Sequence, residues 1–228
     1  VLCIMILVLL VGCSLKKDNS TGKSYSTANM TVDEIKTNDE KLPEGSFSLY
    51  VQDVFKITNR GTVATGDVMV GTVKVGDKVQ IVGNGRVLES KVVSIEKYKN
   101  KGDSATKGEM VGLLLEGVER DQVSRGDVIA TPGAVSNHTE FVAAVYAEEL
   151  EGKGEMNSLT SGGDYTYYFT VGDTTGTIKI DGDKIDAGQI GTATIKLDKA
   201  YGFNTGKTFY IRQNGRTLGR GKVLEITK

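Results

Sequence analysis

The sequence predicts an all-β protein that contains two antiparallel β-barrels. From Phe47 onward, apolar and polar residues alternate in short runs, as Phe47, Leu49 and Val51 do, and this pattern is typical of half-buried strands. Asn84-Gly85 and Asn214-Gly215 each lie between two such runs, where this pair favours a two-residue hairpin. Glycine supplies 29 of the 228 residues, well above the usual share of about 7%, so we expect many tight turns.

The first element along the chain is an apolar segment, residues 1–12, which carries no charge and is followed at once by Cys13 and a polar stretch. It is shorter than the roughly 20 residues that a spanning helix needs, so we interpret it as a signal peptide. Its last residues, Leu10-Val11-Gly12-Cys13, resemble the lipobox of bacterial lipoproteins. This resemblance implies a lipid such as palmitate on Cys13 and a protein anchored at the cell membrane, on its extracytoplasmic face. The alternatives are a merely hydrophobic N-terminus and a truncated spanning helix.

The second element, residues 13–45, combines the lipidated Cys13 with a polar stretch. Such a composition buries too little apolar surface to offset the entropy of ordering, so we expect a flexible stalk. Within it, Thr31 and Glu34 form a capping-box pattern before Ile35, which predicts one short and marginal helix.

Two barrel domains are predicted after the stalk, over residues 46–134 and 135–228. The strand pattern is interrupted near Thr131-Pro132-Gly133, and we place the boundary there. Each part then has about 90 residues, which is a reasonable size for one small barrel.

Composition argues against several classes of function. The 28 basic and 29 acidic residues nearly cancel, whereas proteins that bind nucleic acid through phosphates usually have a strongly basic face. Cys3 and Cys13 are the only cysteines, Cys3 would leave with the signal peptide, and His138 is the only histidine. We therefore expect no disulfide, no metal, no cofactor and no catalytic residues, and hence no enzymatic activity.

Several motifs in the barrel region occur in the order of one known family. They include residues 47–71, Gly108-Glu109-Met110-Val111-Gly112, Asp173-Thr174-Thr175-Gly176 and residues 211–219. In this order and spacing the chain resembles domains 2 and 3 of elongation factor Tu, the translation GTPase. The resemblance implies two translation-protein β-barrels packed side by side. No phosphate loop accompanies them, since Gly22-Lys23-Ser24 has only the end of that motif, so we expect no GTP binding.

The resemblance also implies one binding site, the domain 2 pocket for the 3′ end of aminoacyl-tRNA. By motif it maps onto Asp53, Phe55, Arg60, Thr65 and Glu96. Neighbouring positions depart from the family: Gln52 replaces an acid, Asp67 an arginine and Lys99 an arginine. Because an acidic replacement repels an RNA backbone, we interpret this pocket as vestigial and expect no nucleic-acid partner.

Two other patterns suggest a binding surface. Tyr165, Tyr167 and Tyr168 form a candidate ligand face, although alternation along a strand places Tyr165 and Tyr167 on one side and Tyr168 on the other, so part must be core. Arg125-Gly126-Asp127 spells a tripeptide that some adhesion proteins use, but we interpret it as a family turn before a strand.

The sequence therefore predicts a non-enzymatic, membrane-anchored lipoprotein that presents elongation factor Tu-like barrels outside the cytoplasm. Its partner would be a protein or a cell-envelope ligand. One alternative is an aminoacyl-tRNA or RNA binder that lacks GTPase activity. The other is a structural surface spacer with no ligand.

Overall fold

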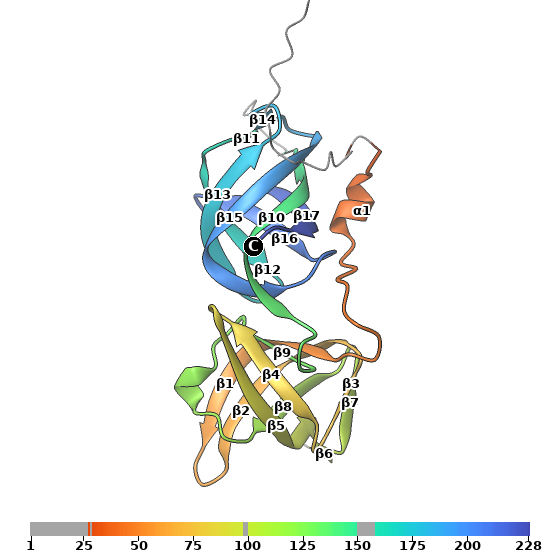
Figure 1. Ribbon diagram of the computed structural model, residues 1–228, viewed down its shortest axis with the longest axis vertical. Helices are drawn as coiled ribbons and strands as arrows, with labels where there is room; N and C mark the ends of the chain where they lie inside the picture. The colour runs from red at the N-terminus through yellow and green to blue at the C-terminus, as the bar shows by residue number, and fades with distance from the viewer. Residues whose placement is uncertain (1–26, 28, 98–99, 150–157) are drawn as a thin grey trace, which may run out of the picture.

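The computed structural model describes residues 27, 29–97, 100–149 and 158–228, and it confirms the all-β prediction. Figure 1 shows two β-barrels stacked along the long axis of the molecule, with the short helix α1 (Val32–Lys36) beside the second barrel. Cys13 and the rest of the predicted signal peptide lie outside the described residues. Within the described ranges, no helix is long and apolar enough to cross a membrane.

The first barrel closes in the strand order β4-β9-β1-β2-β8-β5, with antiparallel neighbours throughout. Its strands are β1 (Ser48–Ile57), β2 (Gly61–Val70), β4 (Lys78–Gly83), β5 (Arg86–Lys97), β8 (Met110–Leu115) and β9 (Val128–Ala130). Short elements border it: β6 (Asn100–Gly102) pairs with β5, β3 (Thr72–Lys74) pairs with β7 (Ser104–Thr106), and the 3-10 helix η1 (Arg120–Gln122) precedes β9.

The second barrel closes in the order β10-β15-β13-β12-β16-β17. Its strands are β10 (Ser136–Ala147), β12 (Asp164–Phe169), β13 (Asp173–Ile180), β15 (Ile190–Phe203), β16 (Thr208–Gln213) and β17 (Arg216–Ile226). The short strands β11 (Leu159–Thr160) and β14 (Lys184–Ile185) pair with each other at its far end (Figure 1).

Both predicted hairpins are present. Asn84 and Gly85 connect β4 to β5, and Asn214 and Gly215 connect β16 to β17. All four residues have positive φ, between 50° and 78°, which is the backbone of a type I′ turn and matches the twist of the flanking strands. Local sequence chemistry is therefore enough to explain these two connections.

The interiors of the two barrels differ in character. The first is filled mainly by aliphatic side chains, among them Leu49, Ile81 and Leu113. The second holds a cluster of aromatic rings, in which Phe169 stacks on Phe203 with ring centroids 5.1 Å apart. Each barrel thus has a hydrophobic core of its own.

A third, smaller apolar cluster joins the barrels. Tyr50 and Val82 come from the first barrel and Val171 from the second, and all are buried. Hydrogen bonds flank the cluster, including one from Asn137 Nδ2 to the Arg86 carbonyl at 2.9 Å. The predicted domain boundary, between residues 134 and 135, falls in the connection from β9 to β10.

The prediction of a flexible stalk over residues 13–45 is wrong for the last part of that range. Residues 29–45, called the strap below, follow the second barrel down to the first (Figure 1). The strap contains α1, whose capping box is present as predicted, and the helix buries Ile35 completely. Backbone N–H groups of Asp39 and Lys41 donate to the carbonyls of Gly206 and Thr205, at 3.3 and 2.8 Å.

One acidic residue, which composition does not single out, helps to hold the strap in place. The Glu40 carboxylate accepts from the Tyr50 hydroxyl at 2.8 Å, from the Asn204 backbone N–H at 3.0 Å and from Lys207 Nζ at 3.3 Å. The Lys207 side chain is fully buried, and its ammonium lies 3.6 Å from the centroid of the Tyr50 ring. Long-range pairing and the burial of Ile35 thus offset the entropy that local composition could not.

Candidate functional site

The candidate site is a groove on the outer wall of the first barrel, with a volume of about 720 Å³. It is lined by Phe55, Ile57, Val63, Thr65, Glu96, Lys97, Asn100, Lys101 and Gly112. Phe55, Thr65 and Glu96, three of the five residues that the family resemblance assigned, are therefore in one groove. The remaining two, Asp53 and Arg60, lie beside it.

Strand register explains why residues so distant in sequence meet here. Asp53 pairs with Thr65, Thr65 with Gly112, and Gly112 with Glu96, so the four form one row across β1, β2, β8 and β5. Neighbouring strands lie about 4.8 Å apart, which places successive members of the row within contact distance. Gly112 keeps the middle of the row open, because a Cβ atom there would lie only 3.1 Å from Val63 Cγ1.

One wall of the groove is apolar. Phe55 is 50% exposed, although phenylalanine is usually buried, and its register partner Val63 closes the groove beneath. Ile57 continues this wall along the same face of β1. The wall offers a surface for an apolar group.

The opposite rim is charged. Arg60 Nη2 pairs with Glu96 Oε1 at 2.8 Å, and both side chains are more than a third exposed. Lys97 Nζ pairs with Glu109 at 2.7 Å, and the hydrogen bond from Lys97 holds the pKa of the Glu109 carboxyl below its usual value. An exposed pair such as Arg60–Glu96 contributes at most about 1 kcal/mol, so a ligand can replace it at small cost.

Asp53 has a structural role in this arrangement. Its carboxylate accepts from the Val54 backbone N–H at 2.8 Å, and its carbonyl accepts from the Thr65 hydroxyl at 3.4 Å. Two departures from the family pattern also form one unit, since Gln52 Nε2 donates to Asp67 at 2.5 Å across β1 and β2. These two replacements therefore keep a polar cross-strand contact. Lys99 lies outside the described residues.

The prediction of a ligand face is wrong for two of its three tyrosines. Tyr165 and Tyr167 point into the second barrel and are 4% and 0% exposed, so neither ring can stack on a ligand. The Tyr165 hydroxyl accepts from the Thr160 backbone N–H at 3.1 Å. Only Tyr168 is on the outer face, as the alternation within β12 requires.

Sequence reasoning missed the neighbours that Tyr168 has on that outer face. Tyr168 pairs with Tyr210, Tyr210 with Arg220, and Arg220 with Tyr146, so a row of three tyrosines and an arginine crosses four strands. The Arg220 guanidinium lies 5.0 Å from the Tyr210 ring centroid, and Tyr210 is 46% exposed. Alternation in residues 209–211 could have placed Tyr210 outward, but register across strands was needed to assemble the row.

The Arg125-Gly126-Asp127 tripeptide is not displayed for adhesion. Asp127 is only 1% exposed, and its carboxylate accepts from Ser124 N at 2.8 Å and pairs with Arg86 Nη2 at 3.2 Å. A receptor or metal ion therefore has no access to this carboxylate. The interpretation as a structural turn is the one that the geometry supports.

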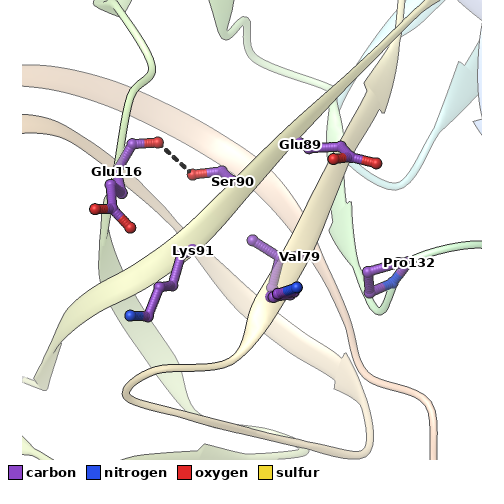
Figure 2. A pocket seen from close by; sticks show the side chains of 7 residues that line it. Val79, Glu89, Ser90, Lys91, Glu116 and Pro132 are labelled. Atoms are coloured by element: carbon purple, nitrogen blue, oxygen red, sulfur yellow. Dashed lines mark hydrogen bonds between the residues drawn. The ribbon is translucent and has the colours of Figure 1, made fainter.

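A second hollow, of about 460 Å³, lies at β4 and β5 (Figure 2). Its lining combines Glu89, Ser90 and Lys91 of β5 with Glu116 and Pro132 from loops, and the Ser90 hydroxyl donates to the Glu116 carbonyl at 2.9 Å. Nothing in the sequence singled out this hollow. Its mixed charges and its single internal hydrogen bond resemble an ordinary solvated surface.

The last features to place are the candidate metal ligands and the single histidine. Within the part of the chain that the structure describes, no group of three His, Cys, Asp or Glu side chains is arranged to hold an ion. His138 is half-buried at the start of β10 with its ring edge against Phe203, 5.4 Å between centroids, and burial lowers its pKa. It is a packing residue at the edge of the second barrel.

Comparison with known families agrees with this geometry. The family model described as elongation factor Tu domain 2 matches residues 61–130, which run from β2 to β9. The first barrel is therefore an elongation factor Tu domain 2-like domain of the translation-protein type. The two closed six-stranded barrels together fit the arrangement of domains 2 and 3 of that factor.

Proposed function

We propose that this protein is a non-enzymatic binding module whose first barrel holds a protein or cell-envelope ligand in the Phe55 groove. The observation that carries the proposal is the exposure of Phe55 beside a charged rim. A half-exposed phenylalanine leaves on the order of 100 Å² of apolar area in water, and covering it contributes roughly 2 kcal/mol to binding.

The groove favours a ligand with one apolar group flanked by charge. The apolar wall of Phe55, Ile57 and Val63 accepts a hydrocarbon or aromatic group. Lys101 on the rim has no ion-pair partner among the described residues and suits a carboxylate. A peptide segment with an aromatic or aliphatic residue next to an acidic one has this chemistry.

The proposal includes a lipid anchor on Cys13, at the extracytoplasmic face of the cell membrane. It is supported by the uncharged segment 1–12 and by the lipobox-like Leu10-Val11-Gly12-Cys13. The test is metabolic labelling with a palmitate analogue, comparing the parent with Cys13→Ala. We expect the parent to be labelled and membrane-bound and Cys13→Ala to be neither; equal labelling of both would contradict the anchor.

The groove itself is tested by affinity capture from intact cells with Phe55→Ser. Val87→Ser is the matched control, because Val87 is 51% exposed but lies at the opposite end of β5 from Glu96. We expect Phe55→Ser to lose most of the saturable binding and Val87→Ser to keep it. Equal capture by the parent and Phe55→Ser would refute a role for this groove, and absence of any saturable ligand would favour a structural spacer.

A second candidate function is binding of an aminoacylated RNA 3′ end without GTP hydrolysis. The observation that favours it is the single row that holds Asp53, Thr65 and Glu96, with Phe55 one row away. Protection of aminoacyl-tRNA against ester hydrolysis distinguishes the two. A slower hydrolysis in the presence of the protein, reversed by Phe55→Ser, would support RNA binding; an unchanged rate would leave the protein-ligand proposal in place.

A further inference from the structure

A small cavity of about 140 Å³ lies where the two barrels meet, away from the Phe55 groove. Its lining comes from the end of β4 and the turn after it, the loop before β9, the turn between β12 and β13 with the start of β13, and β15. The residues that matter here are Arg125, Gly126, Gly172, Asp173, Lys199 and Tyr201. Because both barrels contribute, the cavity exists only in the assembled molecule.

The buried part of the cavity contains a hydroxyl group without an acceptor. Tyr201 is 8% exposed, and its Oη forms no hydrogen bond with any described residue. The Gly172 backbone N–H is close enough to oppose part of the pKa increase that burial causes, but an N–H group cannot accept the phenol proton. A buried donor without a partner costs free energy, so a ligand that brings an acceptor to this hydroxyl gains binding energy.

Two glycines make room for that hydroxyl. A Cβ atom on Gly126 would lie 2.8 Å from Tyr201 Oη, and one on Gly172 would lie 2.5 Å from it. Both distances are shorter than real Cβ contacts allow, so any other residue would displace the phenol or fill the cavity. The two glycine backbones therefore define the inner wall.

The exposed part of the cavity carries charges of both signs. Lys199 and Asp173 line it, and neither side chain forms a hydrogen bond or ion pair with a described residue. Arg125 Nη1 donates to the Gln52 carbonyl at 3.0 Å, which holds the guanidinium against β1 of the first barrel and leaves its other N–H groups available. Asp127 also lines the cavity, but its carboxylate already accepts from Ser124 N and pairs with Arg86. Two basic residues, the unpaired Asp173 and one phenol donor thus border a common volume.

We propose that this inter-barrel cavity binds a small zwitterion, a free α-amino acid or a molecule of the same chemistry. Its carboxylate accepts from Tyr201 and pairs with Arg125 or Lys199, and its ammonium pairs with Asp173. The size agrees, because a cavity of about 150 Å³ accommodates a molecule the size of benzene, and a small amino acid has a similar number of non-hydrogen atoms. This site is independent of the Phe55 groove.

The test is isothermal titration calorimetry of the full chain with L-alanine and L-serine as probes. Acetate lacks the ammonium and ethanolamine lacks the carboxylate, so these two molecules are the ligand controls. We expect saturable binding of the amino acids and much weaker binding of both controls. Acetate that bound as tightly as alanine would overturn the zwitterion assignment, and failure of both amino acids to bind would overturn the site.

Single substitutions distinguish an effect on ligand binding from an effect on folding. Tyr201→Phe removes only the unpartnered hydroxyl, so we expect about tenfold weaker amino-acid binding with no loss of thermal stability. Asp173→Asn should weaken the amino acids but leave acetate unchanged. Tyr168→Phe, on the outer face of β12, and Phe55→Ser should bind like the parent. If Tyr201→Phe bound both amino acids as tightly as the parent, the cavity would be only a water site and the proposal would be wrong.

Discussion

At the scale of single residues, the buried Glu40–Lys207 ion pair is the feature on which stability should depend most. Both side chains are at most 3% exposed, and Tyr50 and Asn204 supply further hydrogen bonds to the carboxylate. A buried pair adds little compared with two apolar residues, but removing one partner leaves a buried charge unpaired. Burial also lowers the pKa of Lys207 to about 8, although Glu40 opposes that shift. This cluster is where a single substitution should have its largest effect.

Glu40→Ala should lower the free energy of unfolding by about 3 to 5 kcal/mol, because it leaves the buried Lys207 ammonium without its carboxylate partner. Urea titration followed by circular dichroism measures the change. Lys41→Ala is the control, since its pair with Asp39 is exposed and should contribute less than about 1 kcal/mol. Similar losses for the two variants would contradict the importance assigned to the buried pair.

His138 gives the molecule a pH dependence that can be isolated, because it is the only histidine. Burial lowers its pKa below the usual value near 6.5, so the unfolded chain binds more protons than the folded one just below that pH. Stability should therefore fall as the pH drops from 7 toward 5.5. Denaturant titrations of the parent and His138→Gln check this, and a decline of equal size in both would assign it to other groups.

At the scale of elements, the strap shows how tertiary contacts order a segment of low apolar content. Helix α1 has only five residues, too few to be stable alone, and it lies against β10 and β17. Its buried Ile35 and the two backbone hydrogen bonds of Asp39 and Lys41 hold the strap in place.

Ile35→Asp should release the strap while both barrels stay folded, because each barrel has its own core. Hydrogen exchange should then show lost protection at the amides of Asp39 and Lys41, with β10 to β17 unchanged. Lys36→Asp, at an exposed position of the same helix, is the control and should exchange like the parent. Retained protection in Ile35→Asp would show that the strap does not depend on this side chain.

At the scale of the whole molecule, the interface between the barrels decides whether they behave as one unit. Three sets of contacts cross it: the shared apolar cluster, the Asn137–Arg86 hydrogen bond, and the bonds from Glu40 to Tyr50 of the first barrel and Lys207 of the second. We therefore expect one cooperative thermal transition in the parent.

Val171→Asp should split that transition into two, since it places a charge in the shared cluster, where Val171 is 6% exposed, and leaves both barrel cores intact. Differential scanning calorimetry is the measurement. Val93→Asp, at a position 47% exposed, should keep a single transition. One transition in Val171→Asp would mean that the barrels are coupled by something other than this cluster.

The features that the sequence predicts well are local ones. The strand alternation, the two Asn-Gly hairpins and the Thr31 capping box each depend on residues within a few positions of one another. Three residues of the Phe55 groove were also identified, through motifs of the domain 2 family. Alternation alone could indicate that Tyr165 and Tyr168 face opposite ways, but not which of them faces the core.

The sequence by itself thus determined the fold class and the hairpins, because short-range propensity and periodicity encode them, and its family resemblance indicated three residues of the first groove. Only the tertiary structure decided that the strap is bound, that Tyr165 and Tyr167 are core, and that Tyr201 meets Gly126 between the barrels. The physical reason is sequence separation: Glu40 and Lys207 are 167 positions apart. Nothing local signals such a pair, and its free energy exists only once both barrels have closed and met.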